Sequence, residues 1–229
     1  MSQTIIPCHI PNLVHNPGGN LIYTGNLDHY YRCKWNWCEG SGRAFPSRGL
    51  TATHYLMWEC YEAMIGCKKT DRPDPVESRN LLIAACLLNI NRSPKKGLSS
   101  SEQLDRTFEA LDSLILEEDL ESIDSIRKIM RAGVGFSLPR VRMVSPSKAE
   151  QIMWDICMSQ VFSEYHAEFL YFDVAEELGL TSRQMFDRLP EIMKEIGKFE
   201  TSYAEHRFAS RIPSRLALAQ EFFSILNGR

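Results

Sequence analysis

The chain of 229 residues lacks any apolar run of about eighteen residues, the length that a membrane-spanning helix needs. Its first residues also lack the charged and then apolar pattern of a secretory signal. We therefore expect a cytoplasmic or otherwise intracellular protein that is not secreted and has no membrane partner. An apolar fraction of 44% and a charged fraction of 24% are ordinary for a folded domain, which argues against disordered and fibrous classes.

Signatures of catalysis are also missing from the sequence. It has no glycine-rich phosphate loop that ends in Lys-Ser or Lys-Thr, no His-Glu-x-x-His pair and no Gly-x-Ser-x-Gly elbow. Glu164, His166 and Glu168 lie close together in the sequence, but side chains two positions apart point to different faces of a helix. We assign no catalytic residues and expect a protein that is not an enzyme.

The cysteines do not form the even set that a disulfide framework needs. There are seven of them in a chain without an export signal, which favours free thiols or metal ligands. Cys60, Cys86 and Cys157 lie within apolar helical patterns, where a cysteine packs as a small apolar residue. We expect those three in the core.

A candidate zinc site remains near the N-terminus. Cysteines separated by a few residues can form a chelating knuckle, and residues 38–42 resemble half of the cysteine and glycine repeat of chaperone-type zinc modules. His29 is a competing ligand, and the alternative is a pair of reduced thiols packed with Trp35 and Trp37. The predicted zinc ligands are Cys8, His15, Cys33 and Cys38.

Composition divides the chain into three predicted domains. Residues 1–50 are rich in proline, glycine and aromatics, which predicts a loop-rich, zinc-stabilised module with a short hairpin over residues 21–31. Residues 51–144 and 145–229 carry helical periodicity and are predicted as two helical domains, the second with a helix-turn-helix-like hairpin. The predicted fold class is mainly α, a multi-helix C-terminal bundle with the loop-rich N-terminal module.

Residues 174–189 resemble the helix-turn-helix of DNA-reading proteins. Ala175 occupies the crossing point of two helices, and Gly179 occupies the turn that requires a positive φ. The first turn of the second helix in such a motif reaches base edges. The alternative is an ordinary helical hairpin, in which the glycine only ends one helix. The predicted DNA-contacting residues of the motif are Thr181, Ser182, Arg183, Gln184 and Arg188.

The net charge of −3 is divided unevenly along the chain. Residues 1–100 carry eleven Lys or Arg against seven Asp or Glu, whereas residues 101–229 carry fifteen against twenty-two. Phosphate contacts need basic side chains, and aromatic rings can stack on bases, so the first half is the better place for a nucleic acid. Arg32, Lys34 and Trp35 are therefore predicted nucleic-acid-binding residues, and the alternative is that the aromatics form the core of a small module.

Two functions of different classes follow from these patterns. The first is a nucleic-acid-binding protein, a regulator or a subunit of a complex that handles DNA or RNA, with DNA expected ahead of RNA. The second is a non-catalytic helical interaction protein, such as an adaptor, a viral accessory protein or an assembly subunit. It binds another protein or a second copy of itself, and the acidic second half with its many apolar helix faces favours it.

Overall fold

The structure is a computed structural model of the chain. It describes residues 6–7, 13–15, 21–23, 25–40, 50–91, 100–133, 145–159, 175, 179–188 and 199–211, and seven positions between 213 and 225. The predicted zinc ligand Cys8 lies outside the described residues, as do the segments 160–174 and 189–198.

Three short strands precede the helices, namely β1 (Ile6–Pro7), β2 (Leu13–His15) and β3 (Leu21–Tyr23). They form an antiparallel sheet in the order β1-β2-β3, with Ile6 opposite His15 and Val14 opposite Ile22. The predicted hairpin over residues 21–31 is wrong beyond β3, because the chain turns at Gly25, whose φ is 56°, and then enters a helix.

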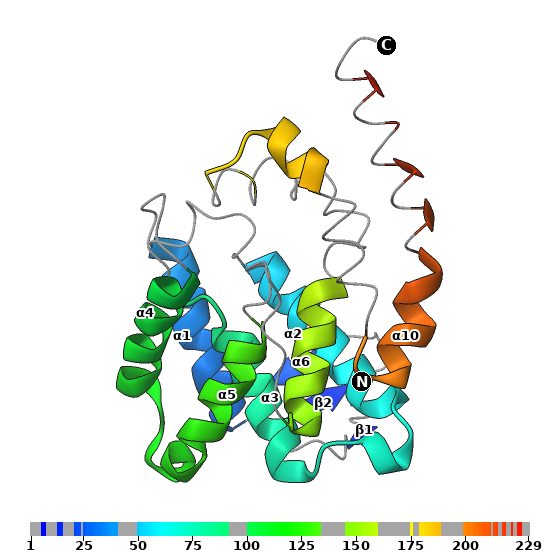
Figure 1. The fold of residues 1–229 in the computed structure, drawn as a ribbon. Helices are drawn as coiled ribbons and strands as arrows, with labels where there is room; N and C mark the ends of the chain where they lie inside the picture. The colour runs from blue at the N-terminus through cyan, green and yellow to red at the C-terminus, as the bar shows by residue number, and fades with distance from the viewer. Residues whose placement is uncertain are drawn as a thin grey trace, which may run out of the picture.

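The described chain is mainly helical, as predicted (Figure 1). The α-helices are α1 (Asn26–Gly40), α2 (Leu50–Gly66), α3 (Pro75–Leu87), α4 (Ser100–Leu114), α5 (Ile123–Gly133), α6 (Lys148–Ser159) and α10 (Ser202–Phe208). Three short 3-10 helices are η3 (Lys69–Asp71), η4 (Glu117–Ser122) and η7 (Ala209–Arg211). Residues 182–188 and the described positions from 213 to 225 are also helical.

Capping boxes fix the start of two of these helices. The Ser147 hydroxyl accepts a hydrogen bond from the Glu150 amide at 3.3 Å, and the Ser147 amide donates to the Glu150 carboxylate at 2.9 Å. At α3, Asp74 accepts from the Glu77 amide at 2.8 Å, and Pro75 occupies the first helical position, where no amide is needed.

The α3 helix is the centre of the bundle. Nine of its residues are buried, including every residue from 80 to 87, so it is buried on all sides. Helices α1, α2, α5 and α6 pack against it, and Figure 1 shows α3 between them. A helix that is apolar on all sides is stable only when other helices cover every side. This requirement explains why α3 lies at the centre of the bundle.

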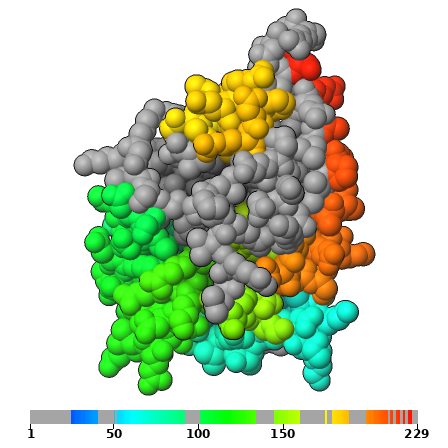
Figure 2. Space-filling model, in the orientation of Figure 1, coloured from blue at the N-terminus to red at the C-terminus, as the bar shows by residue number. Residues whose placement is uncertain are grey.

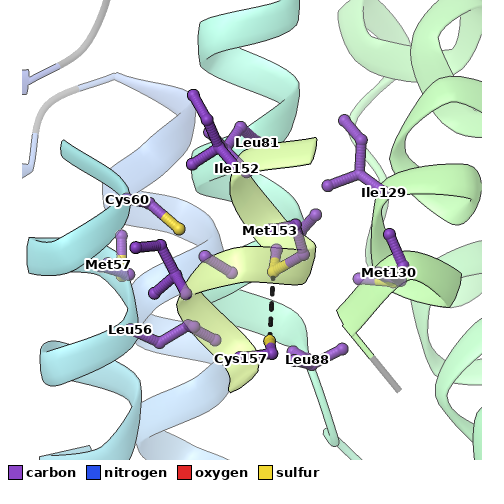
Figure 3. Packing of buried hydrophobic residues seen from close by; sticks show 14 of the residues in the cluster. Leu56, Met57, Cys60, Leu81, Leu88, Ile129, Met130, Ile152, Met153 and Cys157 are labelled. Atoms are coloured by element: carbon purple, nitrogen blue, oxygen red, sulfur yellow. Dashed lines mark hydrogen bonds between the residues drawn. The ribbon is translucent and has the colours of Figure 1, made fainter. Parts of the chain in front are cut away.

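Sulfur-containing side chains fill much of the core around α6. Figure 3 shows Met153 and Cys157 of α6 between α2 and α5, and the Cys157 thiol donates to the Met153 sulfur at 3.6 Å. Cys60, Cys86 and Cys157 are all buried, which confirms their prediction as core residues. One hydrophobic cluster includes residues from 27 to 208, so the predicted domain boundaries after residues 50 and 144 fall between elements that share a core.

The prediction of a loop-rich module over residues 1–50 is wrong for residues 26–40. These residues form α1, whose side chains at positions 27, 30, 34 and 38 are buried, and α1 packs on α3. The core around these residues therefore comes from the bundle itself.

No helix within the described part of the chain is both long enough and apolar enough to span a bilayer.

Candidate interaction surfaces

The geometry of α1 does not support the predicted zinc knuckle. Cys33 and Cys38 lie on one continuous helix, where five residues correspond to a rotation of about 140° and a rise of about 7.5 Å. Their side chains therefore leave the helix in different directions. Of the other predicted ligands, Cys8 and the His15 side chain lie outside the described residues.

The predicted competing ligand, His29, is used within α1 and against α4. Its Nε2 atom lies 3.7 Å from the Cys33 sulfur and 3.1 Å from the Leu114 carbonyl oxygen. Burial raises the pKa of both the Cys33 and the Cys38 thiol. Among the residues that the structure describes, no three His, Cys, Asp or Glu side chains are arranged to hold a metal ion.

Lys34 is buried and does not offer its charge to a phosphate. Its side chain is 0% exposed, and Nζ donates a hydrogen bond to the Leu88 carbonyl oxygen at 3.0 Å. Leu88 is the C-cap of α3, where carbonyl oxygens are unpaired and a cation is favourable. The ammonium also lies 4.6 Å from the centre of the Trp37 ring. Lys34 thus caps the central helix.

An exposed aromatic surface lies between α1 and α2. The Tyr31 and His54 rings are stacked with centroids 5.4 Å apart, and Tyr31 is hydrogen bonded to His54 Nε2 at 2.6 Å. Trp35 lies beside Tyr31 and is 45% exposed, whereas Arg32 is paired with Asp28 at 2.8 Å. Partial burial lowers the pKa of His54, so this histidine adds little positive charge at neutral pH.

The glycine turn at Gly179, which both the predicted helix-turn-helix and the alternative helical hairpin require, is present. Gly179 has a φ of 68°, and the Leu180 amide donates to the Ala175 carbonyl oxygen at 2.8 Å. This is the bond that closes a helix with a glycine in the left-handed conformation. Ala175 and Met185 are buried, so the turn is anchored on both sides. The other described residues of this segment are exposed or half-buried, and Figure 2 shows the segment on the surface of the molecule.

The predicted base-reading side chains are engaged within the hairpin. The Thr181 hydroxyl accepts from the Gln184 amide at 3.1 Å, and the Gln184 side chain accepts from the Thr181 amide at 2.8 Å. This capping box uses the side chains of both residues. Arg183 is paired with Asp187 at 3.1 Å, while Arg188 is exposed and Ser182 is half-buried.

Sequence reasoning missed a buried carboxylate in η4. Asp119 is paired with Arg79 of α3, and its Oδ2 accepts from Tyr30 at 2.8 Å and from Asn26 at 2.9 Å. The Tyr30 hydroxyl also accepts from the Leu116 amide at 3.1 Å, and its burial raises its pKa. This network ties α1, α3 and η4 together.

A second buried carboxylate joins α6 to the start of α10. Asp155 accepts from the amides of Glu200 and Thr201 at 2.8 and 2.7 Å and from the Thr201 hydroxyl at 2.6 Å. Burial raises the pKa of Asp155 to about 7, although these hydrogen bonds oppose the shift. Asp155 is the single charged residue among the apolar residues 152–158, a signal of burial that the sequence reasoning did not use.

Further along α10, Arg207 pairs with the buried Glu59 of α2 at 2.9 Å. Glu59 Oε2, Arg207 Nε and the Tyr203 hydroxyl are buried, with no hydrogen-bond partner among the residues that the structure describes. Buried polar atoms of this kind are commonly satisfied by ordered water. We therefore assign this cluster to the attachment of α10 to the bundle.

Large apolar side chains are exposed at two ends of the molecule. Val76 and Leu120 are 60% and 48% exposed, and Leu218 and Ile225 are 44% and 70% exposed. Val76 lies one turn before Arg79, and Leu120 follows Asp119, so the Arg79–Asp119 pair brings the first two to the same end of the bundle.

The surface around Leu120 is acidic. Glu117, Glu118 and Glu121 are exposed beside it in η4. We call Val76, Leu120 and these three glutamates the η4 patch. The tail, here residues 213–225, is different, because all of its described positions are exposed and helical.

Comparison with protein families, with curated proteins and with solved structures finds no match to this chain. The structure itself shows the class of fold, which is a mainly helical bundle with buried ion pairs and exposed apolar side chains at two ends.

Proposed function

We propose that this chain is a non-catalytic helical interaction protein, which acts by binding another protein through its exposed apolar ends. The observation that carries the proposal is the tail. Leu218 and Ile225 are both helical and exposed, and they are seven residues apart, a spacing that favours one side of a helix. Exposed apolar side chains that share one face are typical of a helix that docks into a groove of a partner.

The buried ionisable groups agree with this class of function. Asp119, Asp155, Glu59 and Lys34 are each bound to groups of neighbouring helices, which gives them structural roles. A catalytic acid or base needs access to a substrate, whereas these side chains are at least nine-tenths buried. The proposal therefore assigns function to the surface of the bundle and not to its interior.

Site-specific photocrosslinking in the cells that make the protein tests the proposal. A photoreactive side chain at position 218 or 225 should give covalent adducts with protein, whereas the same side chain at position 205 should not. Glu205 is the matched control because it is exposed on the neighbouring helix α10 but is not apolar. An absence of protein adducts at 218 and 225 would contradict the proposed function.

A second candidate, nucleic-acid binding, rests on the exposed Trp35 ring beside the half-buried Tyr31 ring and on Arg183, whose side chain is exposed at the start of a capped helix. Asp187 holds Arg183 and competes with a phosphate for it. If DNA binds at this place, Asp187→Asn raises the affinity for duplex DNA at low salt, and Trp35→Ala lowers the affinity for single strands. Unchanged affinities in both variants across a salt series rule out these sites.

A further inference from the structure

The two exposed apolar ends of the chain are complementary in charge. The η4 patch carries three exposed glutamates around Leu120, and the Arg79 charge beside it is already paired with Asp119. The segment 211–229, which contains the tail, carries three arginines (211, 215 and 229) against one glutamate (221). Both ends carry exposed aliphatic side chains. The η4 patch is negative and the segment 211–229 is positive, so the two ends attract each other.

The two ends also lie at opposite ends of the same molecule. In Figure 1, η4 and the start of α3 are at the bottom of the bundle, whereas the described tail positions extend beyond α10 toward the C-terminal mark. Figure 2 shows the same separation, with the tail atoms at the upper edge and residues of the 100–133 segment at the lower left. The tail thus does not cover the patch of its own chain.

We propose that the occupant of the η4 patch is the tail of a second copy of this chain, so that the protein associates head to tail. This inference rests on the proposed function and names its partner. Leu218 and Ile225 of one copy pack on Val76 and Leu120 of the next, and the positive charge of the 211–229 segment is attracted to the glutamates of the patch. Because the contact joins two different surfaces, it generates open chains or closed rings of copies, the smallest ring being a pair that exchanges tails.

The first test is the size of the purified full-length protein, measured by sedimentation velocity over a wide concentration range. The wild type should form a ladder of oligomers whose association weakens as salt rises, because the contact pairs opposite charges. A wild type that stays monomeric at every concentration and salt overturns the inference. In that case, photocrosslinks from position 218 to a different protein still support the proposed function.

Variants of each surface then identify the contact. A tail variant, Leu218→Asp with Ile225→Asp, and a patch variant, Val76→Arg with Leu120→Arg, should each weaken association by about tenfold or more. As controls, Ser202→Asp and Ser101→Arg each place one charge of the same sign at an exposed position of α10 or α4 and should leave association unchanged. Circular dichroism verifies that every variant is folded.

Mixing the two variants separates head-to-tail association from a symmetric contact. The tail variant keeps an intact patch and the patch variant keeps an intact tail, so only one productive contact forms between them. A 1:1 complex of limited size from two proteins that are each monomeric supports the inference. Failure of the mixture to associate, or tail variants that oligomerise like the wild type, overturns it.

Discussion

The bundle holds two of its buried carboxylates, Asp119 and Asp155, in opposite ways. Asp119 in η4 is paired with a guanidinium and also accepts hydrogen bonds from a tyrosine and an asparagine. Asp155 in α6 accepts three hydrogen bonds from residues 200 and 201, and no cation is paired with it among the residues that the structure describes. The first centre joins α1, α3 and η4 inside the bundle, and the second joins α10 to its side.

The difference between the two centres concerns the compensation of charge. A buried carboxylate without a cation keeps its negative charge only at a cost, and burial accordingly raises the pKa of Asp155 to about 7. At Asp119 the Arg79 guanidinium supplies the compensating charge directly. We infer that the stability of the α10 attachment depends on pH. Loss of Asp119 instead destabilises the bundle, because it leaves the Arg79 charge and the Tyr30 hydroxyl without their partner.

The largest effect is expected at the paired centre. Asp119→Ala leaves the half-buried Arg79 charge and the hydroxyl of Tyr30 without their partner, and it should lower the free energy of unfolding by about 3 kcal/mol. Urea denaturation followed by circular dichroism measures the change. Asp124→Ala removes an exposed carboxylate from the adjacent α5 and should cost less than about 0.5 kcal/mol. Equal costs for the two variants would show that the Asp119 network contributes nothing.

A pH-dependent effect is expected at Asp155. An unfolded aspartate has a pKa of about 4, so between about pH 4 and pH 7 the folded state binds more protons than the unfolded state. The stability that this group contributes is complete below pH 4 and is lost as the pH rises to about 7. The free energy of unfolding of the wild type should therefore fall, relative to Asp155→Asn, by on the order of a few kcal/mol over this range.

Urea denaturation of both proteins in a series of buffers measures this difference. Because the asparagine side chain of the variant does not titrate, the other ionisable groups cancel when the two proteins are compared. A difference that stays constant from pH 4 to pH 7 contradicts the raised pKa of Asp155. A difference that grows in favour of the wild type with rising pH reverses the sign and contradicts it as well.

The elements that the sequence predicted share local signals. The start of α6 has a serine followed three residues later by a glutamate, and the structure forms the capping box that this spacing favours. The turn at Gly179 is likewise readable, because a glycine between two helical patterns indicates the left-handed conformation that it adopts. Such features depend on neighbours in the chain, so one sequence is enough to predict them.

The features that the sequence did not reveal depend on distant contacts. The prolines and glycines of residues 1–50 favour a loop-rich module, yet Leu27, Tyr30, Lys34 and Cys38 repeat at helical spacing and are buried in α1, which packs on α3. A lysine in such a stripe is buried only because the end of another helix supplies a carbonyl acceptor. The partners of Asp119 and Asp155 come from residues about 40 to 90 positions away, which no local pattern identifies.

The smallest effect is expected where both charges of a pair are exposed. Arg183 and Asp187 are one helical turn apart, and their side chains are more than half exposed, so water screens their attraction. Arg183→Ala should change the free energy of unfolding by less than about 0.5 kcal/mol. Thr181→Ala, three residues earlier than Gln184, removes the cap of the same short helix and should cost about 1 kcal/mol.

Together, these two variants extend the comparison of the buried carboxylates to the surface. The two substituted positions are two residues apart, at the start of the same surface helix. A larger loss of unfolding free energy in Thr181→Ala than in Arg183→Ala therefore identifies the capping of backbone amides, and not the ion pair, as the stabilising contact. Urea denaturation at low and at high salt distinguishes the two contacts further, because only the contribution of an ion pair decreases with salt. We conclude that an ion pair of this protein stabilises the fold when it is buried, and that pairing alone is not enough. A loss of unfolding free energy in Arg183→Ala that equals the loss in Asp119→Ala would contradict this conclusion.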